Sequence, residues 1–455
     1  MSTGSHPVPH RFHRPRRWVL WVVIGLVATP LVAVGIAVAV DRAFFSHQPG
    51  YSWPPEPCVL HGIDARCGTF VVPEDRTKPD GRTIGLNVVV LPAWSKPVAE
   101  DAFTYLAGGP GDAATEQALD QGWQASALNV NRDILLVDQR GTGGSSPRGG
   151  DVTQYGTRMA MDDLDAVRVA LGYRQLDVIG SSYGATAAQV YLKLHPSSVR
   201  TLILTGATAI DVPYFDRFAV NAQRALDQLG RLCASQPECR KAFPGWERQF
   251  GELVQAWNAD PAPMTGDQLA SVVQFMLLDL TKAVSIPLVV SRAAEGDYAP
   301  LARAGSRALD VDLNLMGSSI WCNEPWTGLD ASGPWGTEFD SYTTAQIAAF
   351  RRACSTVPKR AEERSLWTLP VSSPVPVLAL VGGADPQDPV ANLSDLKRHF
   401  PDSRTVVFPH TGHQFHVGGC VDPMLTDFVD RGTTRGLDTT ACDGAVRVPP
   451  FELAG

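Results

Sequence analysis

The sequence lacks the surplus of positive charge that would favour binding to nucleic acids or acidic lipids. It has 39 lysines and arginines against 47 acidic residues, which gives a net charge of −8. Because affinity for a polyanion comes largely from basic side chains that neutralise phosphates, this balance argues against a nucleic-acid partner. The sequence also shows no internal repeat.

Metal-ligand spacing is missing as well. The eight cysteines form no C-x-x-C pair, and none has a neighbouring histidine at the spacing of zinc ligands, so zinc binding is disfavoured. All eight lie after residue 57, and their even number is typical of disulfides in an oxidising compartment. Many pairings are open, and the simplest short-range set is Cys58–Cys67, Cys233–Cys239, Cys322–Cys354 and Cys420–Cys442.

Charge is absent from one long segment near the N-terminus. Residues 18–40 form an almost unbroken apolar run, long enough to cross a bilayer as a helix. Arginines precede it, which predicts that residues 1–17 stay in the cytoplasm and that the rest is exported. We therefore expect a single-pass anchor in the cell membrane with the catalytic part outside. A cleaved signal peptide is the alternative, since Ala37-Val38-Ala39 fits the cleavage pattern, and it would give a secreted protein.

A single five-residue motif carries most of the chemical information. Gly180-Ser181-Ser182-Tyr183-Gly184 has the form G-x-S-x-G, and it follows an apolar run at 176–179 and precedes a helix-forming stretch at 185–194. This context is typical of a nucleophile elbow, in which the serine occupies a strained turn and the glycines allow close packing. We therefore predict Ser182 as the catalytic nucleophile.

A glycine-rich loop upstream of the elbow is the expected second part of such a site. Residues 103–106 have the composition of a buried strand and run into Gly108-Gly109-Pro110-Gly111. One backbone N–H from this loop and one from the residue after the nucleophile would bind the oxyanion. Because Pro110 has no N–H, we predict Gly109 and Tyr183 as the donors. A purely structural turn is the alternative interpretation.

The other members of a catalytic triad are expected downstream. Asp385 follows a buried strand at 377–383, and His413 follows a second strand at 405–408. The chain order Ser, Asp, His is that of α/β-hydrolases and differs from the orders in chymotrypsin and subtilisin. We predict that His413 exchanges the proton of the nucleophile and that Asp385 orients the imidazole. Three nearby residues are rivals for these roles, and we expect them to be surface loop residues: Asp388, His410 and His416.

Several strings of the sequence resemble those of one family of bacterial enzymes. They are residues 67–75, the glycine loop, Asp138-Gln139-Arg140-Gly141-Thr142-Gly143, the elbow, Asp385 and Gly412-His413. From residue 53 onward the chain resembles the proline iminopeptidase and tripeptidyl aminopeptidase group of secreted α/β-hydrolases. The resemblance implies a serine aminopeptidase. Ala107 stands where the iminopeptidase loop usually has a histidine, which favours the tripeptidyl-aminopeptidase-like branch.

The order of the expected elements divides the chain. Strands alternate with helices up to about residue 210, which predicts a mostly parallel sheet with helices on both faces. Helical patterns without a clear strand follow, and the alternation resumes near residue 375. We therefore predict an α/β-hydrolase fold with a helical cap inserted before the strand that carries the acid. The predicted parts are the basic N-terminus (1–17), the transmembrane segment (18–40), a linker (41–57), the first half of the core (58–210), the cap (211–370) and the second half of the core (371–455).

The cap is where we expect substrate recognition. An enzyme that requires a free α-amino group needs a carboxylate in a partly desolvated pocket, and the resemblance implies a cap acid that faces this amine. Glu324 is the best match, and a surface carboxylate is the alternative. Trp321 and Trp326 line an apolar pocket or belong to the core. Arg140 is expected to brace nearby loops through hydrogen bonds.

These features predict an extracytoplasmic serine exopeptidase that removes short N-terminal units from peptides through an acyl-enzyme. An esterase, lipase or amidase is the alternative, because fold and triad do not distinguish these activities. A catalytically inactive binding protein is disfavoured by the complete set of motifs. The expected partners are a peptide or a small ester or amide substrate and, through residues 18–40, the membrane. No metal or cofactor is expected.

Overall fold

A computed structural model describes residues 53–454 except 148, 306–310, 312, 362, 369–371 and 414–418. The predicted transmembrane segment at 18–40 and the basic segment before it lie outside the described residues. Within the part that is described, no helix is long and apolar enough to span a bilayer.

The described residues form a nine-stranded sheet in the order β1-β2-β3-β5-β4-β6-β7-β8-β9. The pairs β1–β2, β2–β3 and β3–β5 are antiparallel, and the pairs from β5–β4 to β8–β9 are parallel, so the predicted mostly parallel sheet is confirmed. The strands are β1 (Glu56–Leu60), β2 (Ile63–Pro73), β3 (Thr83–Leu91), β4 (Ala102–Leu106), β5 (Ile134–Val137), β6 (Leu176–Ser181), β7 (Val199–Thr205), β8 (Val377–Gly382) and β9 (Ser403–Phe408).

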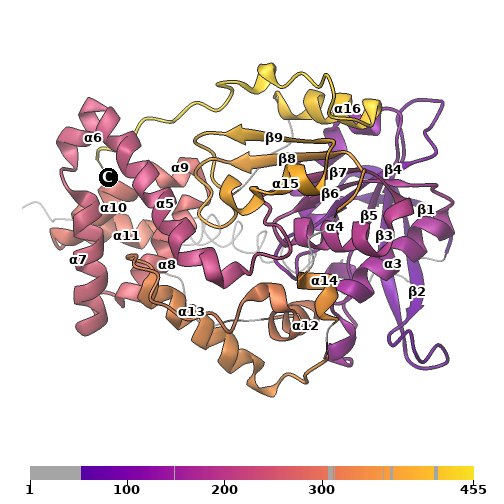
Figure 1. Cartoon of the computed structure of the whole chain (residues 1–455), viewed down its shortest axis with the longest axis horizontal. Helices are drawn as coiled ribbons and strands as arrows, with labels where there is room; N and C mark the ends of the chain where they lie inside the picture. Colours follow the sequence, from indigo (N-terminus) through magenta and orange to yellow (C-terminus); the bar gives the residue numbers. More distant parts are fainter. Residues whose placement is uncertain are drawn as a thin grey trace, which may run out of the picture. The chain divides into compact units, whose positions relative to one another are not determined.

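The central strands are buried on both faces because helices cover the sheet on either side. Every residue of β4, β5 and β8 is buried, as expected for parallel strands inside an α/β protein. Helices α3 and α4 pack against each other, α4 contacts β6, and Figure 1 shows α16 on the opposite side of the sheet from α4. The core helices of at least six residues are α2 (Ala114–Asp120), α3 (Thr157–Leu171), α4 (Tyr183–Leu194) and α16 (Val421–Arg431).

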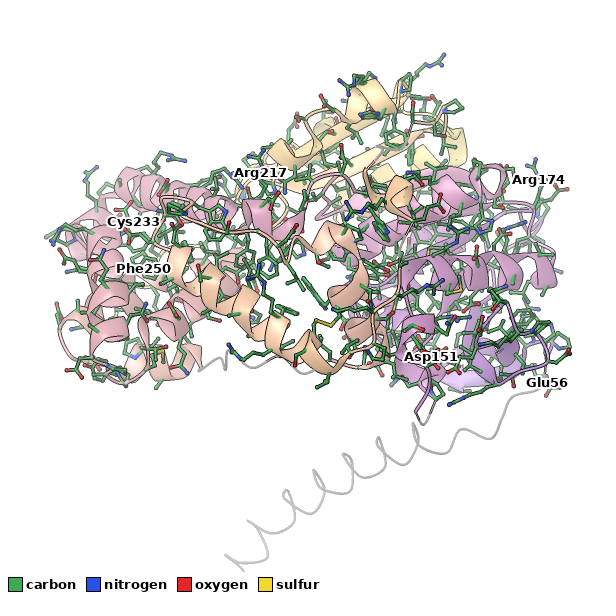
Figure 2. The ribbon with its side chains drawn as sticks, turned by 60° about the horizontal axis from the view of Figure 1, so that its bottom comes forward. Glu56, Asp151, Arg174, Arg217, Cys233 and Phe250 are labelled. Atoms are coloured by element: carbon green, nitrogen blue, oxygen red, sulfur yellow. A yellow bond between two sulfur atoms is a disulfide. The ribbon has the colours of Figure 1, made fainter. Side chains whose placement is uncertain are left out.

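The segment between β7 and β8 forms the helical cap. It has an apolar cluster of its own, built around buried aromatic side chains such as Phe215, Trp246 and Phe250. Figure 1 shows helices α5 to α11 grouped to one side of the sheet, whereas α14 lies close to α4, and Figure 2 labels Cys233 and Phe250 within the first group. The cap helices are α5 (Tyr214–Ser235), α6 (Pro237–Ala242), α7 (Trp246–Ala259), α8 (Gly266–Leu277), α9 (Leu280–Ala283), α10 (Ile286–Ala294), α11 (Ala299–Ala304), α12 (Leu315–Asn323), α13 (Asp340–Ala353) and α14 (Arg364–Thr368).

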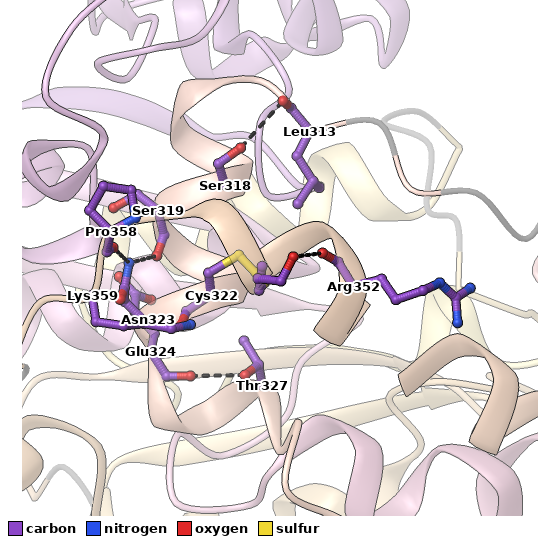
Figure 3. The surroundings of a disulfide bond; sticks show 12 residues. Leu313, Ser318, Ser319, Cys322, Asn323, Glu324, Thr327, Arg352, Pro358 and Lys359 are labelled. Carbon is purple, nitrogen blue, oxygen red and sulfur yellow. Dashed lines mark hydrogen bonds between the residues drawn. A yellow bond between two sulfur atoms is a disulfide. The ribbon is translucent and has the colours of Figure 1, made fainter. Parts of the chain in front are cut away.

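All four predicted disulfides are present, with S–S distances of 1.95 to 2.16 Å. The bond between Cys322 and Cys354 joins the end of α12 to the residue that follows α13, next to Glu324 (Figure 3). A chain with four disulfides is typical of oxidising, extracytoplasmic compartments.

The first two strands differ from the expectation. β1 begins at Glu56, inside the range predicted as linker. Part of β2 lies in residues 67–75, which were singled out for their resemblance to the family and not as a strand. Neither strand alternates cleanly between buried and exposed positions, because both belong to an antiparallel extension at the edge of the sheet. The sequence of these two strands therefore lacks the regular alternation of apolar and polar residues from which a strand is predicted.

Candidate active site

The predicted nucleophile lies in a strained turn between β6 and α4. Ser182 has φ 55° and ψ −126°, a backbone conformation that non-glycine residues rarely adopt. A Cβ on Gly180 would lie 2.2 Å from the carbonyl oxygen of Gly184, and a Cβ on Gly184 would lie 2.0 Å from that of Leu106. Only glycine fits at both positions, which is the reason for the G-x-S-x-G spacing.

The glycine-rich loop contacts the turn that carries Ser182. A Cβ on Gly108 would come within 3.2 Å of the Ser182 Cβ, and Gly109 lines the same pocket as Ser182. The Gly108 N–H donates to Gln117 Oε1 at 2.9 Å, so this N–H is already engaged inside the protein. This contact favours Gly109 as the loop's oxyanion donor.

The predicted acid and base lie in direct contact. His413 Nδ1 and Asp385 Oδ2 are 2.9 Å apart, and Asp385 is fully buried. The second oxygen of Asp385 accepts the backbone N–H groups of Gln387 at 2.8 Å and Asp388 at 2.9 Å. These bonds fix the carboxylate, which in turn fixes the imidazole so that its Nε2 edge is free to face a nucleophile.

Ser182 and His413 border the same end of β7. The Ser182 N–H donates to the Thr205 carbonyl at 3.0 Å, and a Cβ on the next residue, Gly206, would lie 2.8 Å from His413 Cε1. The parallel register places the ends of β6, β7, β8 and β9 at one edge of the sheet. The three predicted triad residues therefore emerge at this edge.

The electrostatics of the pair favour an ion pair. Burial alone would raise the pKa of Asp385, but the charge of His413 and the hydrogen bonds to the carboxylate hold it below its usual value. Burial would lower the pKa of His413, but the charge and hydrogen bond of Asp385, with the charge of Asp388, raise it to about 9. Such an environment stabilises an imidazolium.

One of the three rival residues is part of the site, contrary to the expectation of a surface position. Asp388 is buried, lines the pocket beside Ser182 and has Oδ2 3.6 Å from His413 Nδ1. Burial raises its pKa to about 7, an effect that the charge of His413 opposes. His410 is partly buried and borders a different cavity, which is lined by the cap helices α5, α8 and α9 and by Ala384. His416 lies outside the described residues.

Asp385, Asp388 and His413 bring possible metal-ligating atoms within 4.8 Å of one another. The Nδ1 of His413 and both oxygens of Asp385 already take part in hydrogen bonds within the protein. The contacts of a catalytic acid–base pair therefore account for the cluster.

A pocket of about 110 Å³ opens onto Ser182. Both tryptophans singled out in the sequence line it and are also buried, with Trp326 in the apolar core of the sheet and Trp321 in that of the cap. Tyr214, at the start of α5, packs edge-on against Trp321. The lining residues are Gly109, Ser182, Tyr183, Thr186, Thr208, Ala209, Ile210, Val212, Tyr214, Trp321, Trp326, Gln387 and Asp388.

Glu324 lies behind the pocket and is not one of its lining residues. Its side chain is buried, so the surface alternative is wrong. Oε1 accepts the Thr157 N–H at 2.7 Å, and Oε2 accepts the Thr157 hydroxyl and Trp326 Nε1, both at 2.8 Å. The Thr157 hydroxyl also contacts the Tyr183 hydroxyl at 2.8 Å. None of these contacts supports the predicted binding of a substrate amine. They connect Glu324 to Trp326, which lines the pocket, and through Thr157 to Tyr183, which also lines it.

Arg140 braces the loops around the site, as predicted. Its guanidinium is fully buried and bonds both oxygens of Asp163, at 2.6 and 2.9 Å. It also donates to the carbonyl oxygens of Glu74 and Gln154, both at 2.8 Å.

Helix α5 of the cap holds the two catalytic loops, a role that sequence reasoning missed. Arg224 donates to the carbonyl oxygens of Gly383 at 2.9 Å and Asp385 at 2.7 Å. Asn221 donates to the Gln387 carbonyl at 2.7 Å, and Gln228 donates to the Pro409 carbonyl at 2.6 Å. The donors lie three and four residues apart on one face of the helix, a polar stripe that is visible in the sequence although its partners are not.

The cap also contacts the histidine loop directly. The His413 N–H donates to the Leu278 carbonyl at 2.9 Å, and a Cβ on Gly412 would lie 2.4 Å from the same oxygen. Only glycine at position 412 permits this approach. The position of His413 therefore depends on the cap as well as on the core.

The sheet, the strained serine turn and the His413–Asp385 pair are the defining features of an α/β-hydrolase. Known families agree with this class: one described as "alpha/beta hydrolase fold" matches residues 105–242, and one described as "TAP-like protein" matches residues 340–442. The fold and the site are those of an α/β-hydrolase, and the matched families and peptidase relatives support a serine hydrolase similar to the proline iminopeptidases and TAP-like proteins.

Two curated relatives illustrate the similarity. Serine protease Hip1 of Mycobacterium tuberculosis is 27% identical over 281 residues, which are 49% of this chain and 53% of that protein. A proline iminopeptidase of Aeromonas sobria is 33% identical over 169 residues, 33% of this chain and 39% of its own. The chain thus spans about half the length, or less, of these relatives. A solved proline iminopeptidase structure from Mycobacterium smegmatis aligns with 80% of this chain and 98% of its own at 18% identity and a TM-score of 0.42.

Proposed function

We propose that this chain is a serine exopeptidase that releases short N-terminal units from peptides. The observation that carries the proposal is that Ser182, in its strained turn, and the hydrogen-bonded His413–Asp385 pair border the same end of β7, with a pocket that opens onto Ser182. The peptidase relatives support a peptide substrate, and the TAP-like match supports the tripeptidyl-aminopeptidase-like branch.

In the proposed mechanism, Ser182 attacks the scissile carbonyl while His413 removes its proton. Asp385 stabilises the imidazolium that forms, and the backbone N–H groups of Gly109 and Tyr183 bind the oxyanion. His413 then protonates the leaving amine, which departs and leaves an acyl-enzyme. A water molecule, activated by the same histidine, releases the N-terminal unit and regenerates Ser182.

The proposed location is outside the cytoplasm, with residues 18–40 as a membrane anchor or, alternatively, a cleaved signal. The four disulfides support an oxidising compartment. Comparing the N-terminal sequence of the mature protein in membrane and soluble fractions of the producing cell tests both forms.

A substrate panel tests the activity. It comprises peptide anilides with a free N-terminus, the same anilides with an acetylated N-terminus, and short acyl esters. We expect the free peptides to give the highest kcat/KM, and Ser182→Ala to lower it by about 1000-fold or more. Cleavage of acetylated peptides as readily as free ones would overturn the exopeptidase proposal, and a clear preference for acyl esters would establish the esterase alternative. Full activity in Ser182→Ala would overturn the mechanism.

A further inference from the structure

The pocket beside Ser182 contains one acidic side chain among its described lining residues, and it is not the one expected from the sequence. The other lining residues are glycine, aliphatic, aromatic or neutral polar. A protonated α-amine that enters such a pocket loses part of its hydration, and an opposite charge must compensate for this loss. Asp388 is the lining residue that carries such a charge.

Asp388 is held in a defined position. Its Oδ1 accepts a hydrogen bond from the Thr208 hydroxyl, which in turn accepts one from Asn392 Nδ2 at 2.8 Å. Its backbone N–H donates to Asp385 Oδ1 at 2.9 Å. The side chain is 10% exposed, and Thr208 and Gln387 line the pocket next to it. A carboxylate fixed in this way is preorganised for a ligand and loses little freedom when the ligand binds.

The contact between Asp388 and the imidazole is too long for a hydrogen bond that orients the ring. Its Oδ2 lies 3.6 Å from His413 Nδ1, whereas Asp385 Oδ2 lies at 2.9 Å from the same nitrogen. The orienting role is therefore filled, and the imidazole is the charged group that faces Asp388 among the described residues, at this longer distance. A cation from the substrate would supply a closer partner.

We propose that Asp388 is the specificity-determining residue that binds the α-ammonium group of the peptide substrate. This inference rests on the proposed exopeptidase function and assigns the amine contact to the loop that carries the catalytic acid. The amine contact and the catalytic acid then share one segment, residues 385–388, so that a bound N-terminus is aligned with the triad. The length of peptide between this amine and Ser182 sets the size of the unit that is released.

The electrostatic environment of Asp388 agrees with such a ligand. Burial raises the pKa of Asp388 to about 7, so the carboxylate is only partly ionised near neutral pH without a bound cation. An ammonium group in the pocket favours the ionised form, in the same way as any nearby positive charge.

The test compares three anilides with the same side chain: one with a free α-amine, one with the amine acetylated, and one with the amine replaced by hydrogen. The variants are Asp388→Asn and Asp388→Ser, with Asp395→Asn as the matched control for the loss of one negative charge. Asp395 is exposed and does not line this pocket. Thermal denaturation verifies that each variant is folded.

We expect Asp388→Asn to raise KM for the free-amine substrate by about tenfold or more relative to its effect on the two amine-free substrates. The readout is the ratio of kcat/KM for the free-amine substrate to kcat/KM for each amine-free substrate. A changed charge beside His413 alters kcat/KM for all three substrates alike and therefore leaves this ratio unchanged. Asp395→Asn should keep the wild-type ratio.

Two results would overturn the assignment. If wild-type enzyme prefers the free amine and both Asp388 variants keep this preference, another group binds the amine. If Asp388→Asn lowers kcat equally for all three substrates, the residue positions His413 and does not contact substrate. A wild-type enzyme that shows no preference would instead overturn the proposed exopeptidase function, which this design distinguishes from a failure of Asp388 alone.

Discussion

His413 is flanked by two carboxylates, and this arrangement dominates the chemistry at the scale of single residues. Asp385 makes the hydrogen bond at 2.9 Å, and Asp388 adds a second negative charge at 3.6 Å. Both charges favour the imidazolium that forms when the serine loses its proton. The same charges oppose the neutral imidazole that must be present before the reaction starts.

This conflict predicts an alkaline pH optimum. A general base acts only when it is deprotonated, and the pKa of His413 is raised to about 9 by its carboxylate neighbours. We therefore expect kcat/KM to increase with pH through an apparent pKa well above the usual histidine value of about 6.5. Asp388→Asn removes one of the charges that raise this pKa and should shift the profile to lower pH. A profile centred below pH 7 in the wild type, or one unmoved in the variant, would contradict this account of the site.

Glu324 provides the second prediction at this scale. Its carboxylate accepts three hydrogen bonds, two from Thr157 and one from Trp326, in a buried position. Glu324→Gln replaces one acceptor oxygen with an NH₂ group that faces a donor, so we expect a loss of about 1–3 kcal/mol in the free energy of unfolding. Activity should fall by the same factor for free and acetylated substrates.

Glu363→Gln is the matched control, because Glu363 is 62% exposed and its ion pair with Arg158 should contribute little to stability. A selective increase in KM for free-amine substrates in Glu324→Gln would instead support the direct amine contact that the sequence suggested.

At the scale of secondary-structure elements, helix α5 joins substrate recognition to catalysis. Its first residue, Tyr214, lines the pocket, and its polar face holds the loops that carry Asp385 and His413. In the described residues the cap is thus bonded to the catalytic loops through several hydrogen bonds. A cap displacement that breaks these bonds would also disturb the acid–base pair.

Arg224 is the residue to test. Arg224→Ala removes two donors to the carbonyl oxygens of Gly383 and Asp385, so the acid loop loses part of its support from the cap and keeps the bond from Asn221. We expect kcat to fall by about 10- to 100-fold with a smaller change in KM, because the residue positions the triad and does not touch substrate. Arg224→Lys should recover only part of the activity, since one ammonium does not match the fork of a guanidinium.

Arg217→Ala is the control on the same helix, at an exposed position that is labelled in Figure 2. Steady-state kinetics and melting curves on the three variants measure the outcome. An unchanged kcat in Arg224→Ala would show that the acid loop holds its position without Arg224.

At the scale of the whole molecule, four disulfides add covalent links to the packing of the apolar cores. Disulfides close loops in the edge strands, in the cap and near the C-terminus, with sequence separations of 6 to 32 residues. Chain entropy predicts that a link across a longer loop contributes more stability.

Removing the Cys322–Cys354 bond by paired serine substitutions should therefore cost about 3–4 kcal/mol, against roughly 2 kcal/mol for Cys233–Cys239. The loops span 32 and 6 residues, respectively. Melting temperatures of the two double variants, measured with and without reductant, give the comparison. A larger loss from the shorter loop would contradict the entropic explanation.

Local patterns in the sequence were sufficient for the turn around Ser182, the strands of the parallel sheet and the nearest-neighbour disulfides. These features depend on residues close in sequence or on burial of whole strands. Asp388 was misjudged because two acids three residues apart look alike until the turn is known. Arg224 was missed because its partners lie about 160 residues away. The role of Glu324 was obscured for the same reason, since Thr157 belongs to a core helix.

The central claim is that Ser182 is the nucleophile of a Ser-His-Asp triad, and covalent labelling tests it most directly. The wild-type protein is treated with an active-site-directed organophosphonate, and the modified residue is located by mass spectrometry of its peptides. We predict one label per chain on Ser182, loss of peptidase activity in proportion to labelling, and labelling slowed by about 1000-fold in His413→Ala. A label on another residue, or a fully labelled protein that still cleaves peptides, would contradict the claim.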